Sequence, residues 1–68
     1  EVTLAEQSPA VGKQIRQLAL PAECAVVGLL REGAVVAPHG DTVLRAGDEV
    51  LVLVSAGAES DVHTALVG

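Results

Sequence analysis

Short apolar stretches alternate along the chain with segments rich in Gly, Pro, Asp and Glu. In the first stretch, Val2 and Leu4 alternate with polar neighbours, which predicts a short edge strand over residues 1–4. The strongest strand pattern is the continuous apolar run over residues 50–54, which follows Gly47-Asp48. We expect Asp48 to fix the turn that enters this strand, by accepting hydrogen bonds from nearby backbone amides.

A helical pattern follows the first strand. Ser8 followed by Pro9 is typical of an N-cap with proline at the first helical position. Three apolar residues then recur on one face at helical spacing: Val11, Ile15 and Leu18. The pattern predicts an amphipathic helix that ends at Leu20-Pro21, because the residue before proline disfavours helical angles.

Residues 24–30 are apolar on both faces, and a second apolar run covers residues 34–37. Arg31-Glu32-Gly33 separates the two runs, which predicts two strands joined by a tight turn. A strand that is apolar on both faces needs cover on both. We expect the helix to cover one face of the sheet and a second subunit to cover the other.

The chain ends in a second helical pattern, with Glu59 or Ser60 as the expected cap. Three apolar residues of this segment are expected to face inward: Val62, Ala65 and Leu66. The predicted order is strand, helix, three strands, helix. We therefore expect one small α+β domain over residues 1–68, with a mainly antiparallel sheet and helices packed on it.

Composition adds an oligomeric expectation. A chain of 68 residues buries only about 60% of its unfolded surface, so its core needs further support. Cys24 is the single cysteine and cannot form an internal disulfide, and no cysteine or histidine cluster offers a structural metal. Oligomerisation is the remaining common device, and we expect a homodimer that forms through the sheet.

Charge and residue types exclude several classes of partner. The formal net charge is −5 with only 4 Lys and Arg residues, whereas nucleic-acid binding needs clustered positive charge. The chain has no aromatic residue on which a base could stack. Its apolar runs are far shorter than the roughly 20 residues needed to cross a bilayer. We expect neither nucleic-acid binding nor membrane insertion.

The reactive side chains form no catalytic pattern. Cys24 opens an apolar strand with no base nearby in sequence, which favours a buried, inert thiol. Neither Ser55 nor Ser60 stands in a Gly-x-Ser-x-Gly motif, so we expect no enzyme activity. His39 and Asp41 lie two residues apart in a loop, but a metal site needs three or more convergent ligands. We expect no metal and no cofactor.

Three segments form a recognisable pattern: residues 11–15 near a helix start, residues 26–31 in a strand, and residues 41–48 before a hydrophobic strand. The most specific part of the pattern is an ordered series before residues 50–54: Pro38, Asp41, Leu44, Gly47 and Asp48. With this pattern the sequence resembles the RCK C-terminal (TrkA-C) domain over nearly its whole length. Any one of these residues alone would be a weak signal.

The resemblance implies a cytosolic, dimerising regulatory domain of potassium channels and transporters or of cation/proton antiporters. Through the parent protein or a partner it would lie at the inner face of the cell membrane. In that family a preceding Rossmann domain binds NAD or ATP, but this chain has no Gly-x-Gly-x-x-Gly after a strand. We therefore assign no such nucleotide site to it.

Some members of the family bind cyclic di-AMP between the two copies of the dimer. The resemblance places that site at six positions: Val26, Val27, Arg31, Val35, Val36 and Pro38. Arg31 could bind a phosphate with its guanidinium, although an arginine beside Glu32 and Gly33 in a hairpin turn is more often a solvated cation. The chain departs from the binding members because it contains no Asn. Two readings stay open: a ligand-sensing dimer and a ligand-free dimerisation module.

Overall fold

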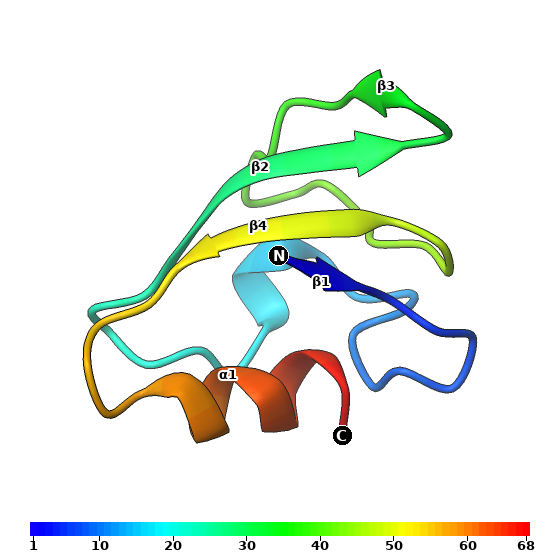
Figure 1. Cartoon of the computed structure of the whole chain (residues 1–68). Helices are drawn as coiled ribbons and strands as arrows, with labels where there is room; N and C mark the ends of the chain where they lie inside the picture. Colours follow the sequence, from blue (N-terminus) through cyan, green and yellow to red (C-terminus); the bar gives the residue numbers. More distant parts are fainter.

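The computed structural model describes all residues, 1–68, and forms one sheet with helices on one side of it (Figure 1). The elements are β1 (Val2–Thr3), the 3-10 helix η1 (Ile15–Gln17), β2 (Ala25–Arg31), β3 (Ala34–Val35), β4 (Glu49–Leu53) and α1 (Glu59–Leu66). The sheet has the strand order β1-β4-β2-β3, and every neighbouring pair is antiparallel. This architecture confirms the predicted small α+β domain with an antiparallel sheet.

The long central strands β2 and β4 carry the core on one face. Leu29 pairs with Val50, and Val26 pairs with Val52, so these side chains point to the same side of the sheet. Seven buried residues make up the core: Leu4, Ala10, Leu29, Leu44, Val50, Val62 and Leu66. The register shifts between Val26 and Gly28, which leaves Val27 in a bulge without a partner on β4.

The turn between β2 and β3 confirms the predicted tight hairpin. Arg31 pairs with Ala34, so only Glu32 and Gly33 lie in the loop. Both have positive φ, 52° and 79°, which is the geometry of a type I′ turn. β3 covers only Ala34–Val35 of the predicted residues 34–37, although the Val36 N–H still donates to Leu29 O on β2 at 2.9 Å.

The predicted amphipathic helix after residue 8 is wrong. Gly12 has φ of 87°, outside the helical region, and its N–H donates to Leu44 O at 2.8 Å. The Ile15 N–H likewise donates to Thr42 O, so this segment pairs with a distant loop and only η1 is helical. Three apolar residues that gave the helical spacing still pack against the core, from a loop: Val11, Ile15 and Leu18.

The last predicted helix is confirmed as α1, with Val62 and Leu66 buried and Ala65 half-buried. Its predicted cap is wrong, because Ala58 occupies the N-cap position without a side-chain hydrogen bond. Ser8 instead caps the C-terminal end of α1. Its hydroxyl donates to Leu66 O and accepts from the Ala10 N–H, so the buried serine closes the C-terminal end of α1.

The hairpin turn yields a stability prediction. A Glu in the left-handed region is strained, whereas Asn tolerates that region well. We expect Glu32→Asn to raise the free energy of unfolding by about 0.5 kcal/mol in urea titrations. Glu23→Asn, at an exposed site with no positive φ, is the matched control. Equal effects of the two substitutions would contradict the assigned turn.

Candidate functional site

A bidentate ion pair joins the end of β2 to the turn before β4. Arg31 donates from Nε to Asp48 Oδ1 at 2.9 Å and from Nη2 to Asp48 Oδ2 at 2.8 Å. The Asp48 side chain is 1% exposed and the Arg31 side chain 19% exposed. It is the one salt bridge in the structure, and its fork-to-carboxylate geometry is the strongest that such a pair can adopt.

Both partners make further hydrogen bonds to the backbone. Asp48 Oδ2 accepts from the Arg45 N–H at 2.8 Å, which confirms the predicted turn-fixing role of Asp48. Arg31 Nη2 also donates to Val43 O at 2.9 Å. Arg31 is therefore not a freely solvated turn cation, and its Nε and Nη2 groups are already hydrogen-bonded within the chain. Its Nη1 is the one guanidinium nitrogen without a protein acceptor.

The ion pair fixes the charge of both groups. The hydrogen bonds from Arg31 hold the pKa of the Asp48 carboxyl below its ordinary value, against the opposing effect of burial, and the Arg45 amide adds to this. The same contact raises the pKa of Arg31. Asp48 therefore stays ionised at neutral pH and does not act as a proton donor there. Its carboxylate accepts the hydrogen bonds that stabilise the turn before β4.

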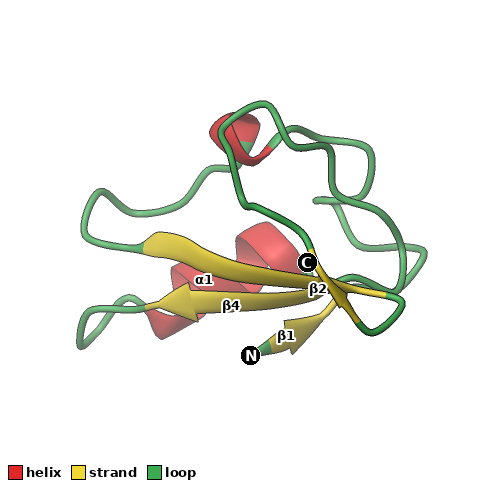
Figure 2. Ribbon diagram, turned by 90° about the horizontal axis from the view of Figure 1, so that it is seen from above, coloured by secondary structure: helices red, strands yellow, loops and turns green.

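The second feature of the site is an apolar sheet face that the chain leaves open. Both η1 and α1 lie on one side of the sheet, and no segment crosses its other side (Figures 1 and 2). We call this open side the outer sheet face. Its four most exposed large residues are Val35 at 82%, Leu53 at 63%, Val27 at 53% and Leu51 at 40%. They come from β2, β3 and β4.

The register explains how these side chains meet. Leu53 lies opposite Ala25 and Leu51 lies opposite Gly28, so both pairs point outward. A Cβ on Gly28 would lie 2.9 Å from Leu51 Cδ1, so the glycine makes room for the leucine to lie across the strand. Val35 pairs with Leu30 on the same face. The result is a set of apolar side chains that extends across this face from the edge strand β3 over β2 to β4.

The six residues that the sequence assigned to a ligand site divide between two environments. Val27 and Val35 lie on the outer sheet face. Val26 and Val36 are half-buried and pack against the core on the other side. Arg31 and Pro38 are half-buried as well. Within one copy of the chain the six therefore do not line a common pocket.

The remaining candidates do not gather into a site. His39 and Asp41 are both exposed, and no group of three or more His, Cys, Asp or Glu residues could hold a metal ion. Cys24 is half-buried with a free thiol rather than fully buried. None of the helices has the length and apolar composition to cross a membrane.

Sequence reasoning missed the contact between Arg31 and Asp48. The two residues lie 17 positions apart, on either side of an irregular loop, so no local pattern links them. The sequence did contain a signal for this contact. Asp48 lies in the turn before one apolar strand, and Arg31, of opposite charge, lies at the end of another. In an antiparallel sheet, that neighbouring strand end lies near the turn.

Comparisons with known proteins agree on one family. The family model of the TrkA-C domain matches residues 1–66. The Trk system potassium uptake protein TrkA of Mycobacterium tuberculosis (strain H37Rv) is 37% identical over 67 residues, covering 98% of this chain and 30% of that protein. A TrkA homolog of Archaeoglobus fulgidus is 43% identical over 53 residues, covering 78% of this chain and 12% of that protein. The chain thus spans less than a third of the length of these relatives.

A solved structure described as "Structure of RCK domain with cda" has the same fold. It superposes with a TM-score of 0.78 at 23% sequence identity and covers 96% of this chain and 91% of that one. Together with the family match, this confirms the resemblance drawn from the ordered series between Pro38 and Asp48.

The ion pair yields a prediction for stability at neutral pH. We expect Arg31→Ala to lower the free energy of unfolding by about 3 kcal/mol, because it leaves the Asp48 carboxylate buried without its partner. Adding Asp48→Asn should recover part of that loss, and Asp41→Asn, at an exposed site, is the control. Urea titration at pH 7 measures all four proteins. A double variant no more stable than Arg31→Ala would contradict this account.

The lowered pKa of Asp48 also fixes a pH dependence. Its carboxyl has a pKa near 3.9 when unfolded and a lower one when folded, so its contribution is complete above about pH 4. That contribution is lost as pH falls through the folded pKa. We expect the stability of the wild type to decrease relative to that of Asp48→Asn as the pH falls below about 4, measured in thermal melts. Parallel curves for the two proteins would contradict the assignment.

Proposed function

Because the chain belongs to the TrkA-C domain family, we propose that it is a regulatory domain of a potassium uptake system. In this proposal the domain pairs with a second copy through the outer sheet face, and a small intracellular ligand binds where the copies meet. The parent transport protein, at the inner face of the cell membrane, is its partner. The observation that carries the proposal is the outer sheet face, an apolar surface left open by a domain of only 68 residues.

The outer sheet face suits a second copy of this chain. Its exposed residues, Val27, Val35, Leu51 and Leu53, belong to three paired strands of the sheet, β2, β3 and β4. Contiguous apolar surface of this kind marks interaction sites in small domains. A two-fold dimer would bring the same surface of each copy together, and it would supply the burial that a core of seven residues does not.

The ligand is proposed to bind at the margin of that interface. Val27 and Val35 would form apolar walls, and Val26 and Val36 would support them from the core side. The ion pair with Asp48 holds the Arg31 guanidinium in one orientation, which leaves Nη1 available to a phosphate. Pro38 follows β3 and adds a rigid edge.

Two copies related by a two-fold axis would present two such guanidinium groups. A ligand with its own two-fold symmetry and two phosphates matches this arrangement, and cyclic di-AMP has both properties. A ligand regulates only if it binds one arrangement of the copies better than another. Binding across the interface meets that condition, because a shift of one copy against the other changes both halves of the site.

One observation favours a second reading, the ligand-free dimerisation module. Arg31 already gives Nε and Nη2 to Asp48 and Val43, so it has one nitrogen left for a phosphate. In that reading the outer sheet face still joins two copies, while sensing belongs to another part of the parent protein. The two readings share the dimer and differ in whether the ligand binds.

The dimer is tested by placing a charge on the outer sheet face. We expect Val35→Lys to weaken self-association by at least about tenfold, because each copy would bury an ammonium group in an apolar interface. Val67→Lys, at a site 44% exposed beyond the end of α1, is the matched control. Sedimentation equilibrium measures both. Unchanged association of Val35→Lys, or a wild type that is monomeric throughout the micromolar range, would overturn the proposed interface.

The ligand is tested by isothermal titration of cyclic di-AMP into wild type, Val35→Lys and Val67→Lys. We expect one ligand per dimer for wild type and Val67→Lys, and loss of binding in the Val35→Lys variant. Arg31→Ala is unsuitable here, because it removes the partner of a buried carboxylate and so changes the fold's stability. A dimeric wild type that shows no binding at two temperatures would contradict the ligand site and favour the dimerisation module.

A further inference from the structure

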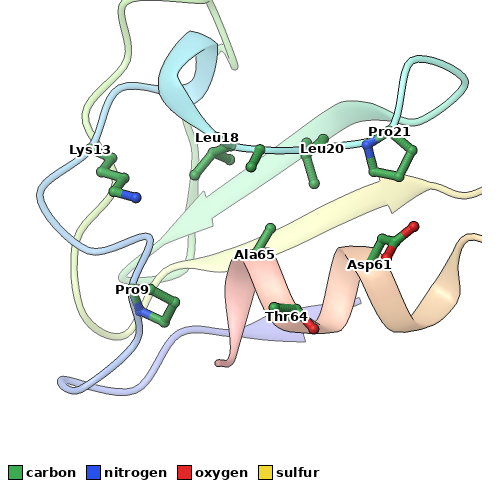
Figure 3. Close-up of a pocket in the computed structure, with 9 residues that line it drawn as sticks. Pro9, Lys13, Leu18, Leu20, Pro21, Asp61, Thr64 and Ala65 are labelled. Atoms are coloured by element: carbon green, nitrogen blue, oxygen red, sulfur yellow. The ribbon is translucent and has the colours of Figure 1, made fainter.

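A groove runs between helix α1 and the segment that follows η1, and it shares no residue with the outer sheet face. Its volume is about 470 Å³, within the range of sites that bind specific ligands. Figure 3 shows residues 18–21 along one wall and α1 along the other. Leu18, Leu20, Pro21 and Ala65 are half-buried and give the groove an apolar floor.

The groove carries one charge of each sign. Lys13 and Asp61 are both exposed and stand at opposite ends of it (Figure 3). Neither takes part in an ion pair, since the one salt bridge of the chain joins Arg31 and Asp48. An occupant with an apolar middle, a cation toward Asp61 and an anion toward Lys13 would therefore complement this surface.

Two residues along the groove, Ala19 and Leu20, have unpaired backbone N–H groups. Leu18 is extended, with φ of −72° and ψ of 137°. The N–H groups of Ala19 and Leu20 donate to no acceptor within the chain. An extended segment with free backbone groups is a template to which a second extended chain can add, with main-chain hydrogen bonds for affinity and side-chain contacts for specificity.

We propose that this groove binds an extended peptide segment of a partner protein, with apolar side chains on the floor, a basic residue at Asp61 and an acidic residue at Lys13. The groove is open rather than enclosed, and the N–H groups of Ala19 and Leu20 beside it are unpaired, which together favour a peptide over a small molecule. The proposal stands apart from the dimer, because it concerns different residues and is measured by a different ligand.

The test uses two end-blocked fluorescent peptides that differ only in order, Lys-Val-Leu-Val-Glu and Glu-Val-Leu-Val-Lys. Fluorescence anisotropy gives the affinity of each for the chain. We expect wild type to prefer one order by about fivefold, since the preferred peptide pairs both charges and the other opposes both. The double variant Lys13→Glu with Asp61→Lys should prefer the opposite order. Both sites are exposed, so the exchange should leave the fold intact.

Two controls separate this site from general charge effects. Glu1→Lys with Arg16→Glu makes the same exchange at exposed sites outside the groove and should keep the wild-type preference. The preferred peptide with its central amides N-methylated should bind at least about tenfold more weakly, because it cannot pair with the backbone. Circular dichroism shows that each variant is folded.

Three results would overturn the proposal. The first is that neither peptide binds wild type at millimolar concentration. The second is that the Lys13 and Asp61 exchange leaves the preference unchanged, or that the control exchange reverses it. The third is that the N-methylated peptide binds as well as its parent, which would mean that charge and apolar contact act without strand pairing. None of these results depends on whether the chain is a dimer.

Discussion

The buried carboxylate of Asp48 is the constraint on which the arrangement of this domain depends. A carboxylate at 1% exposure is unstable unless it is paired, and Arg31 supplies the pairing with two hydrogen bonds. The backbone of Asp48 accepts from the Leu4 N–H, and its side chain accepts from the Arg45 N–H. One residue thus ties the end of β1, the turn before β4 and the end of β2 to each other, while Arg31 extends the network to Val43.

This network lies at one end of the central strands, and the two faces of these strands differ in what covers them. The inner face packs on α1 and on the loop that replaces the predicted first helix, and Ser8 closes the far end of α1. The outer face keeps its apolar side chains exposed on strands whose register the network holds in place. A rigid apolar face on a small domain is suited to joining a second copy, which links the physical constraint to the proposed regulatory role.

The sequence predicted those parts of the fold whose signals are local. Apolar runs gave β2 and β4, Glu32-Gly33 gave the hairpin, and the spacing of Val62 and Leu66 gave α1. The helix expected after Ser8 failed because Val11, Ile15 and Leu18 reach the core from a loop whose backbone pairs with residues 40–44, a contact that spacing alone does not reveal. The ion pair of Arg31 was missed for the same reason. The candidate ligand residues were chosen by resemblance along the chain, and the sheet then placed Val26 and Val27 in different environments.

Two copies of the chain are proposed to meet at their outer sheet faces. The most direct measurement is the NMR relaxation that a paramagnetic probe dissolved in the water causes at methyl groups, recorded at protein concentrations well above and well below the dissociation constant of the dimer. With such a dimer, the methyl groups of four outer-face residues become shielded from the probe at high concentration, while those of Val67 stay as accessible as before: Val27, Val35, Leu51 and Leu53. Equal accessibility of the outer-face methyl groups at both concentrations, with shielding elsewhere or nowhere, would contradict it.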